Sequence, residues 1–165
     1  MARYEEALKT GRLIVKRVNL VVGYDCHFNG MRIKGDKRYD PWPTVTIGDG
    51  FHSGKNSSMR LVDHDWRNGL PYSGWVGKDI EIGDFVWLGE GVTVLKGVKI
   101  GHGAIIQYGS VVVSDIPECA IAGGHPAKPF SSRDKEDFYR RYEAYKEMKA
   151  AKLAAGEEPD RMRTR

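Results

Sequence analysis

Aliphatic residues recur at every sixth position through the middle of the chain, across residues 76–117. The stretch divides into seven hexads, and the first residue of each is aliphatic: Val76, Ile82, Leu88, Val94, Ile100, Ile106 and Val112. The fifth residue of each is small or aliphatic: Ile80, Val86, Val92, Val98, Ala104, Ser110 and Ile116. A period of six matches neither the 3.6-residue period of an α-helix nor the turn spacing of a hairpin sheet.

Short strands that are each followed by a bend can close into a triangular prism with three hexads in every coil. The aliphatic first residues then stack inside the prism, and successive coils lie about 4.8 Å apart and share parallel ladders. Glycine holds the second place in four of the hexads, at Gly77, Gly83, Gly89 and Gly101. We interpret these glycines as bend residues, where the backbone takes conformations that a Cβ resists. A glycine-rich loop region would not keep the aliphatic residues in phase.

The same phase extends upstream of the seven hexads. Residues 47–52 form one hexad, a degraded hexad follows from Ser53, and an earlier pair begins at Val22 and Phe28. Two segments interrupt the repeat, at about 34–43 and 60–75, and the second shifts its register. Loops that leave a regular scaffold commonly carry function, so we expect the site near these insertions.

The length of 165 residues suits a single domain. We expect β-structure over residues 1–130, followed by a helix over 131–155 that is capped by Ser131 or Ser132. The remaining residues, 156–165, are expected to form a disordered tail. The apolar face of the helix is expected to consist of Phe138, Tyr142, Tyr145 and Met148.

The composition argues against several classes of protein. The net charge of +4 and the pI near 9.0 do not indicate nucleic-acid binding, because the basic residues are interleaved with 22 acidic ones. No apolar run approaches the roughly 20 residues that a membrane-spanning helix needs. Cys26 and Cys119 lie far apart without metal-ligand spacing, and the N-terminus does not resemble a signal peptide. We therefore expect a cytoplasmic protein with reduced thiols and no bound metal.

Several segments resemble the hexapeptide-repeat acetyltransferases, and most closely their saccharide and xenobiotic O-acetyltransferase branch. These segments are residues 79–89, 109–112, 115–117 and 122–128. The resemblance is strong over residues 76–130 and weaker elsewhere. It implies an all-β, left-handed parallel β-helix with a C-terminal helix, assembled as a homotrimer. It also implies acetyl-CoA bound in clefts between subunits and a histidine base on a loop that projects from the prism.

The resemblance points to His64, in the second insertion, as the base that accepts a proton from the acceptor hydroxyl. Asp63 or Asp65 could orient its ring, but adjacent side chains on an extended segment point apart, so at most one of them does. Asp25 or a backbone carbonyl is the alternative partner of the ring. A surface histidine without a catalytic role is the alternative for His64, and His52 is the competing base.

Trp87 occupies the sixth position of its hexad, so the pattern directs this large ring outward. The resemblance places it beside the reaction centre, with burial under the C-terminal helix or a neighbouring subunit as the alternative. His102 also points outward and is expected to be a surface residue. Three further tryptophans lie in or beside the insertions, where they either stack on a sugar or pack the loops: Trp42, Trp66 and Trp75.

Coenzyme A requires backbone amides that can approach its pantetheine arm and cations near its phosphates. The small residues of segments 109–110 and 122–124 supply the first, and by resemblance Lys128 and Arg133 lie near the phosphates. His125 is expected to touch the cofactor. The predicted cofactor-binding residues are Trp87, Gly109, Ser110, Ala122, Gly123, Gly124, Lys128 and Arg133. The chain has no P-loop and no dinucleotide-binding fingerprint, which argues against an ATP or nicotinamide enzyme.

These features favour an acetyl-CoA-dependent O-acetyltransferase that acts on a saccharide, either a polysaccharide unit or a sugar precursor. N-acetylation of an amino sugar is the nearest alternative. A β-helix carbonic anhydrase would need three zinc-binding histidines on successive coils, and the spacing of His52, His64 and His102 does not provide them. A non-catalytic scaffold would leave the loop histidine and segment 122–128 without a role.

Overall fold

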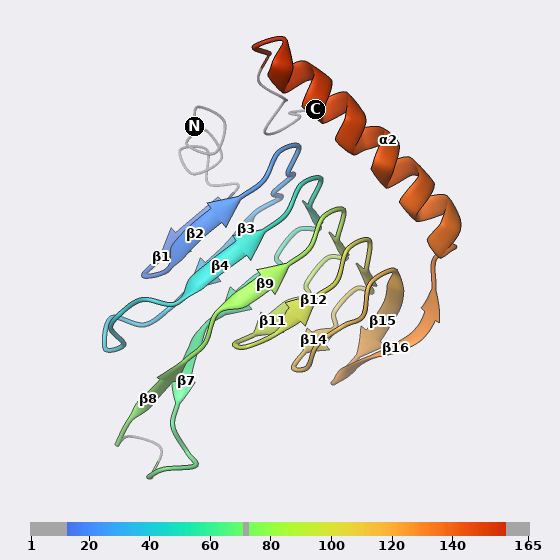
Figure 1. Cartoon of the computed structure of the whole chain (residues 1–165). Helices are drawn as coiled ribbons and strands as arrows, with labels where there is room; N and C mark the ends of the chain where they lie inside the picture. The colour runs from blue at the N-terminus through green and yellow to red at the C-terminus, as the bar shows by residue number, and fades with distance from the viewer. Residues whose placement is uncertain (1–12, 71–72, 158–165) are drawn as a thin grey trace.

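The computed structural model describes residues 13–70 and 73–157, and shows short strands stacked side by side with one long helix along them (Figure 1). The strands are β1 Leu13–Lys16, β2 Asn19–Val22, β3 Met31–Lys34, β4 Thr44–Ile47, β5 His52–Ser53, β6 Ser58–Arg60, β7 Val62–His64, β8 Trp75–Gly77, β9 Ile80–Ile82, β10 Trp87–Leu88, β11 Thr93–Leu95, β12 Lys99–Ile100, β13 Ile105–Ile106, β14 Val111–Val112, β15 Ala120–Gly124 and β16 Ala127–Ser132. The helix is α2, Lys135–Ala154.

Three sheets form the faces of the prism. Sheet A has the order β1-β3-β6-β11-β14, sheet B the order β2-β4-β9-β12, and sheet C the order β5-β10-β13-β15-β16. Every pairing in them is parallel except that of β15 with β16, which turns back at the C-terminal end. Each coil contributes to the three faces in turn, so the predicted left-handed parallel β-helix with a C-terminal helix is confirmed.

The core consists of the first and fifth residues of the hexads, as predicted. From Ile80 to Ile116 every such residue is buried, and Ile47 lies in register with Ile82 on the adjacent coil. The upstream hexads continue this core, since Ile47, Phe51, Ser53 and Phe28 are also buried. The first of the seven predicted hexads is the exception.

Val76 is half-buried and belongs to β8, where it pairs with Asp63 in an antiparallel hairpin. The regular stack therefore resumes at β9, and Val76 does not occupy a core position in it.

The glycines at the second position of the hexads have a different role from the one that their spacing suggested. They are needed because the next coil lies very close: a Cβ on Gly83 would lie 2.7 Å from the amide nitrogen of His102. The left-handed backbone conformation instead falls at the fourth position, for example at Phe85 (φ 56°) and Gly103 (φ 68°). The bend therefore lies two residues beyond these glycines.

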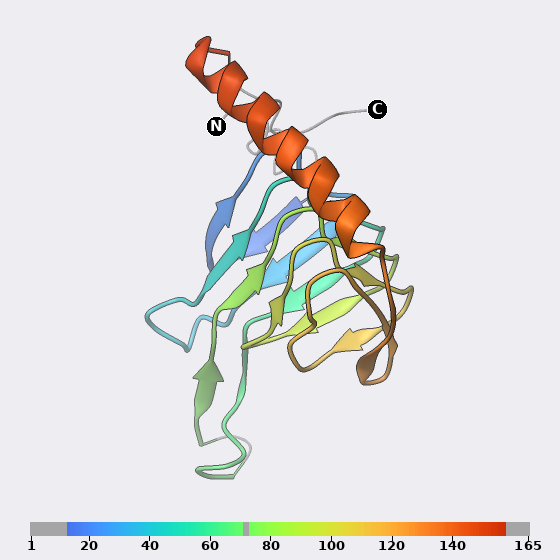
Figure 2. The ribbon, with the colours of Figure 1, turned by 45° about the vertical axis from the view of Figure 1, so that its right-hand side comes forward.

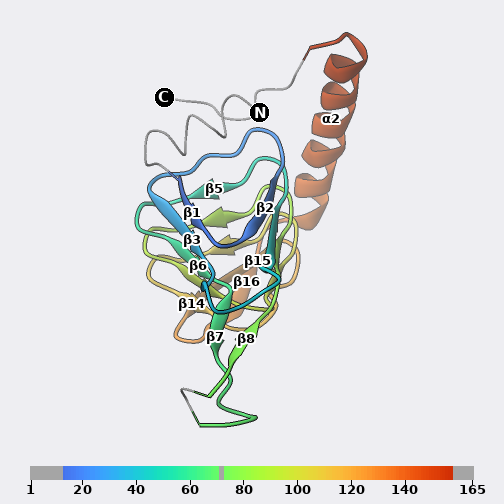
Figure 3. The same ribbon diagram turned by 90° about the vertical axis from the view of Figure 1, so that its left-hand side faces the viewer.

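Both insertions leave the prism at the same corner, between sheets A and B. The segment 35–43 joins β3 to β4, and the β7–β8 hairpin joins β6 to β9. Viewed along the prism, the hairpin projects from one corner while α2 lies near another (Figure 3). A view turned by 45° also shows the hairpin on the side of the prism away from the helix (Figure 2).

Helix α2 begins one turn later than predicted. Its N-cap is Asp134, whose side chain accepts a hydrogen bond from the Asp137 amide, because Ser131 and Ser132 are still extended in β16. Ser131 and Ser132 therefore do not cap the helix. Of the predicted apolar face, Phe138 is buried, whereas Met148 is 46% exposed and takes no part in the core. No helix in residues 13–70 and 73–157 is long and apolar enough to cross a membrane.

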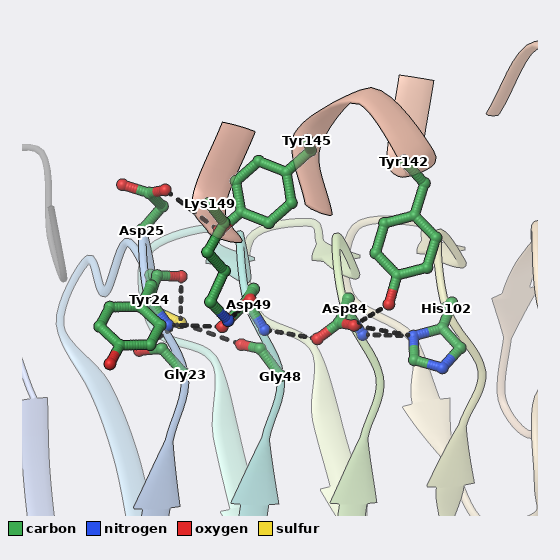
Figure 4. A network of polar contacts seen from close by, with 11 residues as sticks. Gly23, Tyr24, Asp25, Gly48, Asp49, Asp84, His102, Tyr142, Tyr145 and Lys149 are labelled. Carbon is green, nitrogen blue, oxygen red and sulfur yellow. Dashed lines mark hydrogen bonds and ion pairs between the residues drawn. The ribbon is translucent and has the colours of Figure 1, made fainter. Parts of the chain in front are cut away.

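The helix packs along the corner between sheets B and C (Figure 4). The rings of Tyr142 and Tyr145 meet the edge of Phe85 at centroid distances of 5.8 and 4.8 Å. Below them, the Tyr142 hydroxyl donates to Asp84 and the Lys149 ammonium pairs with Asp49. Burial, followed by the contact with Asp84, raises the pKa of Tyr142. One helix thus spans the turns of several coils.

Side chains at this corner also join each coil to the next. Asp49 accepts a hydrogen bond from the Tyr24 amide at 2.7 Å, and Asp84 accepts one from the Asp49 amide. His102 continues the series, because its Nδ1 accepts a hydrogen bond from the Asp84 amide at 2.8 Å. His102 therefore lies at the surface, as the hexad pattern predicts, with its side chain 45% exposed, but it also joins two coils. Cys26 lies beneath the same corner, where burial raises the pKa of its thiol to about 12.

We predict that Gly103→Ala destabilises the protein more than Gly30→Ala does. Both glycines have a positive φ, which costs an alanine about 1–2 kcal/mol. Only at Gly103 would the new Cβ also lie 2.6 Å from the Phe138 ring, whereas nothing lies within 4 Å at Gly30. Denaturant unfolding at one fixed protein concentration should show at least about 1 kcal/mol of additional loss for Gly103→Ala. Equal losses would contradict the packing of α2 on this corner.

Candidate functional site

The β7–β8 hairpin positions His64. The two strands pair Val62 with Gly77 and His64 with Trp75, and the His64 and Trp75 rings lie with their centroids 4.1 Å apart. Both side chains are half-buried. A loop histidine is therefore held by regular backbone pairing and by an aromatic neighbour.

The first insertion braces the second. The Arg38 guanidinium lies 3.6 Å from the centre of the Trp75 ring, so Trp75 contacts both an imidazole and a cation. Arg38 is fixed in turn by two hydrogen bonds to the Asp36 carboxylate, of 2.8 and 2.9 Å. These hydrogen bonds hold the pKa of Asp36 well below its usual range. His64, Trp75 and Arg38 thus form one stack built from two insertions.

The carboxylates beside His64 have other partners. Asp63 accepts a hydrogen bond from the His64 backbone amide at 2.8 Å and forms an ion pair with Lys96 at 3.3 Å. Partial burial disfavours its ionisation, but the amide and the ammonium outweigh this and lower the pKa of Asp63. Asp65 accepts hydrogen bonds from Asn68 within the loop. Asp25 lies at the corner between sheets B and C, where it accepts a hydrogen bond from Tyr145, so it does not orient the His64 ring of its own chain.

Trp87 lies on the outer face of sheet C and is 46% exposed. In register it stands between His52 on the preceding coil and Ile105 on the following coil. His52 contacts the His27 ring, with centroids 5.6 Å apart. Within one chain Trp87 is therefore not buried under α2, and His52 shares its face of the prism rather than the face of the hairpin.

The small residues of the predicted cofactor site gather at the third corner, between sheets C and A. The Gly124 amide donates to the Ser110 hydroxyl at 3.1 Å, and the His125 ring bonds to the Gly109 carbonyl. A Cβ on Gly109 would meet nothing within 4 Å, and one on Gly91, on the adjacent coil, would meet only Gly109 at 3.9 Å. This glycine edge, Gly91 with Gly109, is open to solvent along the prism.

Three further predicted cofactor residues, Ala122, Lys128 and Arg133, are not part of the glycine edge. The Ala122 side chain is fully buried in the core, and its carbonyl accepts a ladder hydrogen bond from Gln107. Lys128 is exposed on β16. Arg133 lies at the corner between sheets B and C, where it donates to the Gly103 carbonyl at 3.3 Å and contacts the Phe138 ring. Ala122 and Arg133 therefore both make structural contacts within the chain.

The chain by itself does not bring the predicted catalytic and cofactor residues together. His64 projects from the corner between sheets A and B, and the glycine edge lies at the corner between sheets C and A. Sheet A separates the two. Within residues 13–70 and 73–157, no group of three or more His, Cys, Asp or Glu side chains is arranged to hold a metal ion.

Comparison with known proteins finds relatives that share the hexapeptide repeat or are named acetyltransferases. Residues 79–114 match the model of the bacterial transferase hexapeptide (six repeats) family. Galactoside O-acetyltransferase from Escherichia coli K12 is 34% identical over 103 residues, which are 60% of this chain and 51% of that protein. The chain spans about half the length of such curated relatives.

Solved structures agree with this result. The structure of a galactoside acetyltransferase in complex with coenzyme A superposes with a TM-score of 0.60 at 26% identity, covering 82% of this chain and 72% of that one. A maltose O-acetyltransferase from Clostridium difficile 630 gives 0.56 at 26% identity, over 81% and 76% of the two chains. The observed fold is thus shared with these enzymes.

We predict that Trp75→Leu loosens the hairpin and that Trp66→Leu does not. Trp75 contacts both His64 and Arg38, whereas Trp66 is 67% exposed and lies near Arg67 of its own loop. Loss of the stack should accelerate amide hydrogen exchange at Val62–His64 by about tenfold. Hydrogen–deuterium exchange of both variants measures this, and unchanged exchange in Trp75→Leu would contradict the bracing.

Proposed function

Since this chain belongs to the hexapeptide-repeat acetyltransferase family, we propose that it transfers an acetyl group from acetyl-CoA to a hydroxyl group of a saccharide. The observation that carries the proposal is a pair of half-sites at the two prism corners where the strands of sheet A begin and end. One is a histidine held on a braced hairpin, and the other is an open glycine edge beside an exposed tryptophan. The proposed setting is the cytoplasm.

His64 acts as the general base in this proposal. A neutral imidazole can take the proton of the acceptor hydroxyl as the hydroxyl oxygen attacks the thioester carbonyl carbon. The resulting tetrahedral adduct collapses by breaking the carbon–sulfur bond, and the imidazolium returns the proton to the leaving thiolate. Because both substrates must be held together for direct transfer, the fixed position of His64 contributes through proximity and orientation.

The glycine edge and sheet C would bind acetyl-CoA. At Gly91 and Gly109 the backbone carries no side chain over two successive coils, so an extended pantetheine arm can run along the prism against it. Trp87 stands on the neighbouring face, on the coil that follows the hairpin. Lys128 is exposed near the C-terminal end of the prism and would face the phosphates. The galactoside acetyltransferase structure with coenzyme A supports this donor.

A homotrimer would complete the site. One chain presents its histidine and its glycine edge at different corners, so each can meet its complement only on another copy. Cyclic assembly of three prisms would place the hairpin of one subunit against the glycine edge of the next, and would repeat this contact three times. The three active sites would then lie between subunits.

We predict that His64→Ala lowers kcat by about 10²- to 10⁴-fold, the usual contribution of a general base. Thiol release from acetyl-CoA in the presence of a panel of sugars measures the rate, and calorimetry should show unchanged coenzyme A affinity. His52→Ala tests the competing base, and because His52 lies on sheet C, away from the His64 hairpin, we expect this variant to keep a kcat within a few-fold of wild type. Normal rates in His64→Ala together with loss in His52→Ala would assign the base to His52.

We predict that two inactive variants restore activity when they assemble together. His64→Ala removes the base, and Gly109→Trp fills the glycine edge, where the wild type leaves open space. In randomly mixed trimers, about one quarter of the sites would combine an intact His64 with an intact Gly109 from the next subunit, giving about one quarter of wild-type activity. Size-exclusion chromatography checks that each variant still assembles. Two correctly assembled variants that stay inactive when mixed would place both residues of a site in one chain.

A further inference from the structure

A column of cations runs up the outer face of sheet A. Lys16 on β1 lies in register with Lys34 on β3, and Lys34 lies in register with Arg60 on β6. Neighbouring parallel strands are about 4.8 Å apart, so three positive side chains stand directly above one another. Arg32 is exposed beside them on the same face. The cationic column is defined here as Lys16, Lys34 and Arg60.

This arrangement is costly unless an anion offsets it. Like charges directly opposite one another on adjacent strands destabilise a sheet. Within residues 13–70 and 73–157, no acidic side chain lies in ion-pair contact with Lys16, Lys34 or Arg60. One acid of each insertion is already paired with another cation, Asp36 with Arg38 and Asp63 with Lys96. The column therefore keeps its charge.

The cationic column is confined to the N-terminal part of sheet A. The next position in register after Arg60 is Leu95, and Val113 further along the face is 47% exposed. An exposed polar face that existed only for solubility would have no reason to separate the charges from the apolar residues in this way. On the coil after the hairpin the nearest cation is Lys96, which is already paired with Asp63.

The column also adjoins the hairpin that carries His64. Arg60 ends β6 and His64 ends β7, four positions later, so their Cα atoms are at most about 13 Å apart in an extended strand. Arg60 lines a cavity of about 230 Å³ together with Val62, Asp63, Leu95 and Lys96, at the base of the hairpin. The cavity thus lies at the foot of the same strand that carries His64.

We propose that the acceptor saccharide carries an anionic group, a phosphate or a carboxylate, which binds to Arg60 and Lys34 at the base of the His64 hairpin. This inference rests on the proposed transferase function and names its substrate class. The guanidinium of Arg60 is suited to two parallel hydrogen bonds to either anion, and Lys34 adds a second charge from the coil below. Lys16 extends the field along the approach to the site.

The test compares matched acceptors that differ only in charge: glucose, glucose 1-phosphate and glucuronic acid, with further neutral and charged pairs of other hexoses. The expected ratio of kcat/KM for the charged over the neutral member is at least about tenfold at low salt, and it should fall as salt screens the contact. Comparison of glucose 1-phosphate with glucuronic acid shows whether the site prefers a phosphate or a carboxylate. Binding of the same pairs in the presence of coenzyme A gives a second readout that does not depend on turnover.

The variant is Lys34→Gln with Arg60→Gln, which should reduce the ratio to near one. The control, Lys99→Gln with Lys152→Gln, removes the same charge from sheet B and from the end of α2 and should keep the wild-type ratio. A wild-type protein that acetylates or binds charged and neutral sugars equally would overturn the anionic acceptor and leave the transferase intact. Failure to bind acetyl-CoA at all would instead overturn the transferase proposal, and this inference with it.

Discussion

The close approach of successive coils constrains the whole molecule. A Cβ on Gly48 would lie 2.7 Å from the Asp84 amide nitrogen, so at these turns the coils are in backbone contact. Coils this close share parallel ladders, and an additional residue within an edge would break the register of every core position after it. Extra chain can therefore leave only at a corner. The corner at which a segment leaves the prism then decides which faces of the prism the segment lies beside.

The three corners consequently have different roles. The corner between sheets A and B carries both insertions, and the stack of His64, Trp75 and Arg38 makes one rigid unit of them. The corner between sheets B and C is joined along its length by α2 and by the acceptors Asp49, Asp84 and His102, so it is structural. The corner between sheets C and A is left bare at Gly91 and Gly109. Stability and the proposed chemistry are thus separated in space.

The hexad pattern was sufficient to predict the fold because core positions in a β-helix recur at a fixed interval along one chain. Ile80 to Ile116 were placed correctly for this reason, whereas Val76 was misplaced because the Val76-Gly77 end of an antiparallel hairpin imitates the start of a hexad. The contacts of the site were less predictable. The stacking of Arg38 on Trp75 joins two insertions of irregular sequence, and no spacing marks it. The roles of Arg133 and His102 likewise depend on which corner each one faces.

Parallel register makes neighbours of residues that lie far apart in the sequence. Lys16, Lys34 and Arg60 are separated by unequal intervals, because the first insertion lengthens one coil, so a search for periodic charge would not find them. In the folded chain the strands fix them in one line, and their repulsion cannot be relieved by moving the backbone. The backbone need not move when an anion binds, so only the side chains of the three cations lose freedom. The stack that specifies the core thus also aligns cations beside the His64 hairpin.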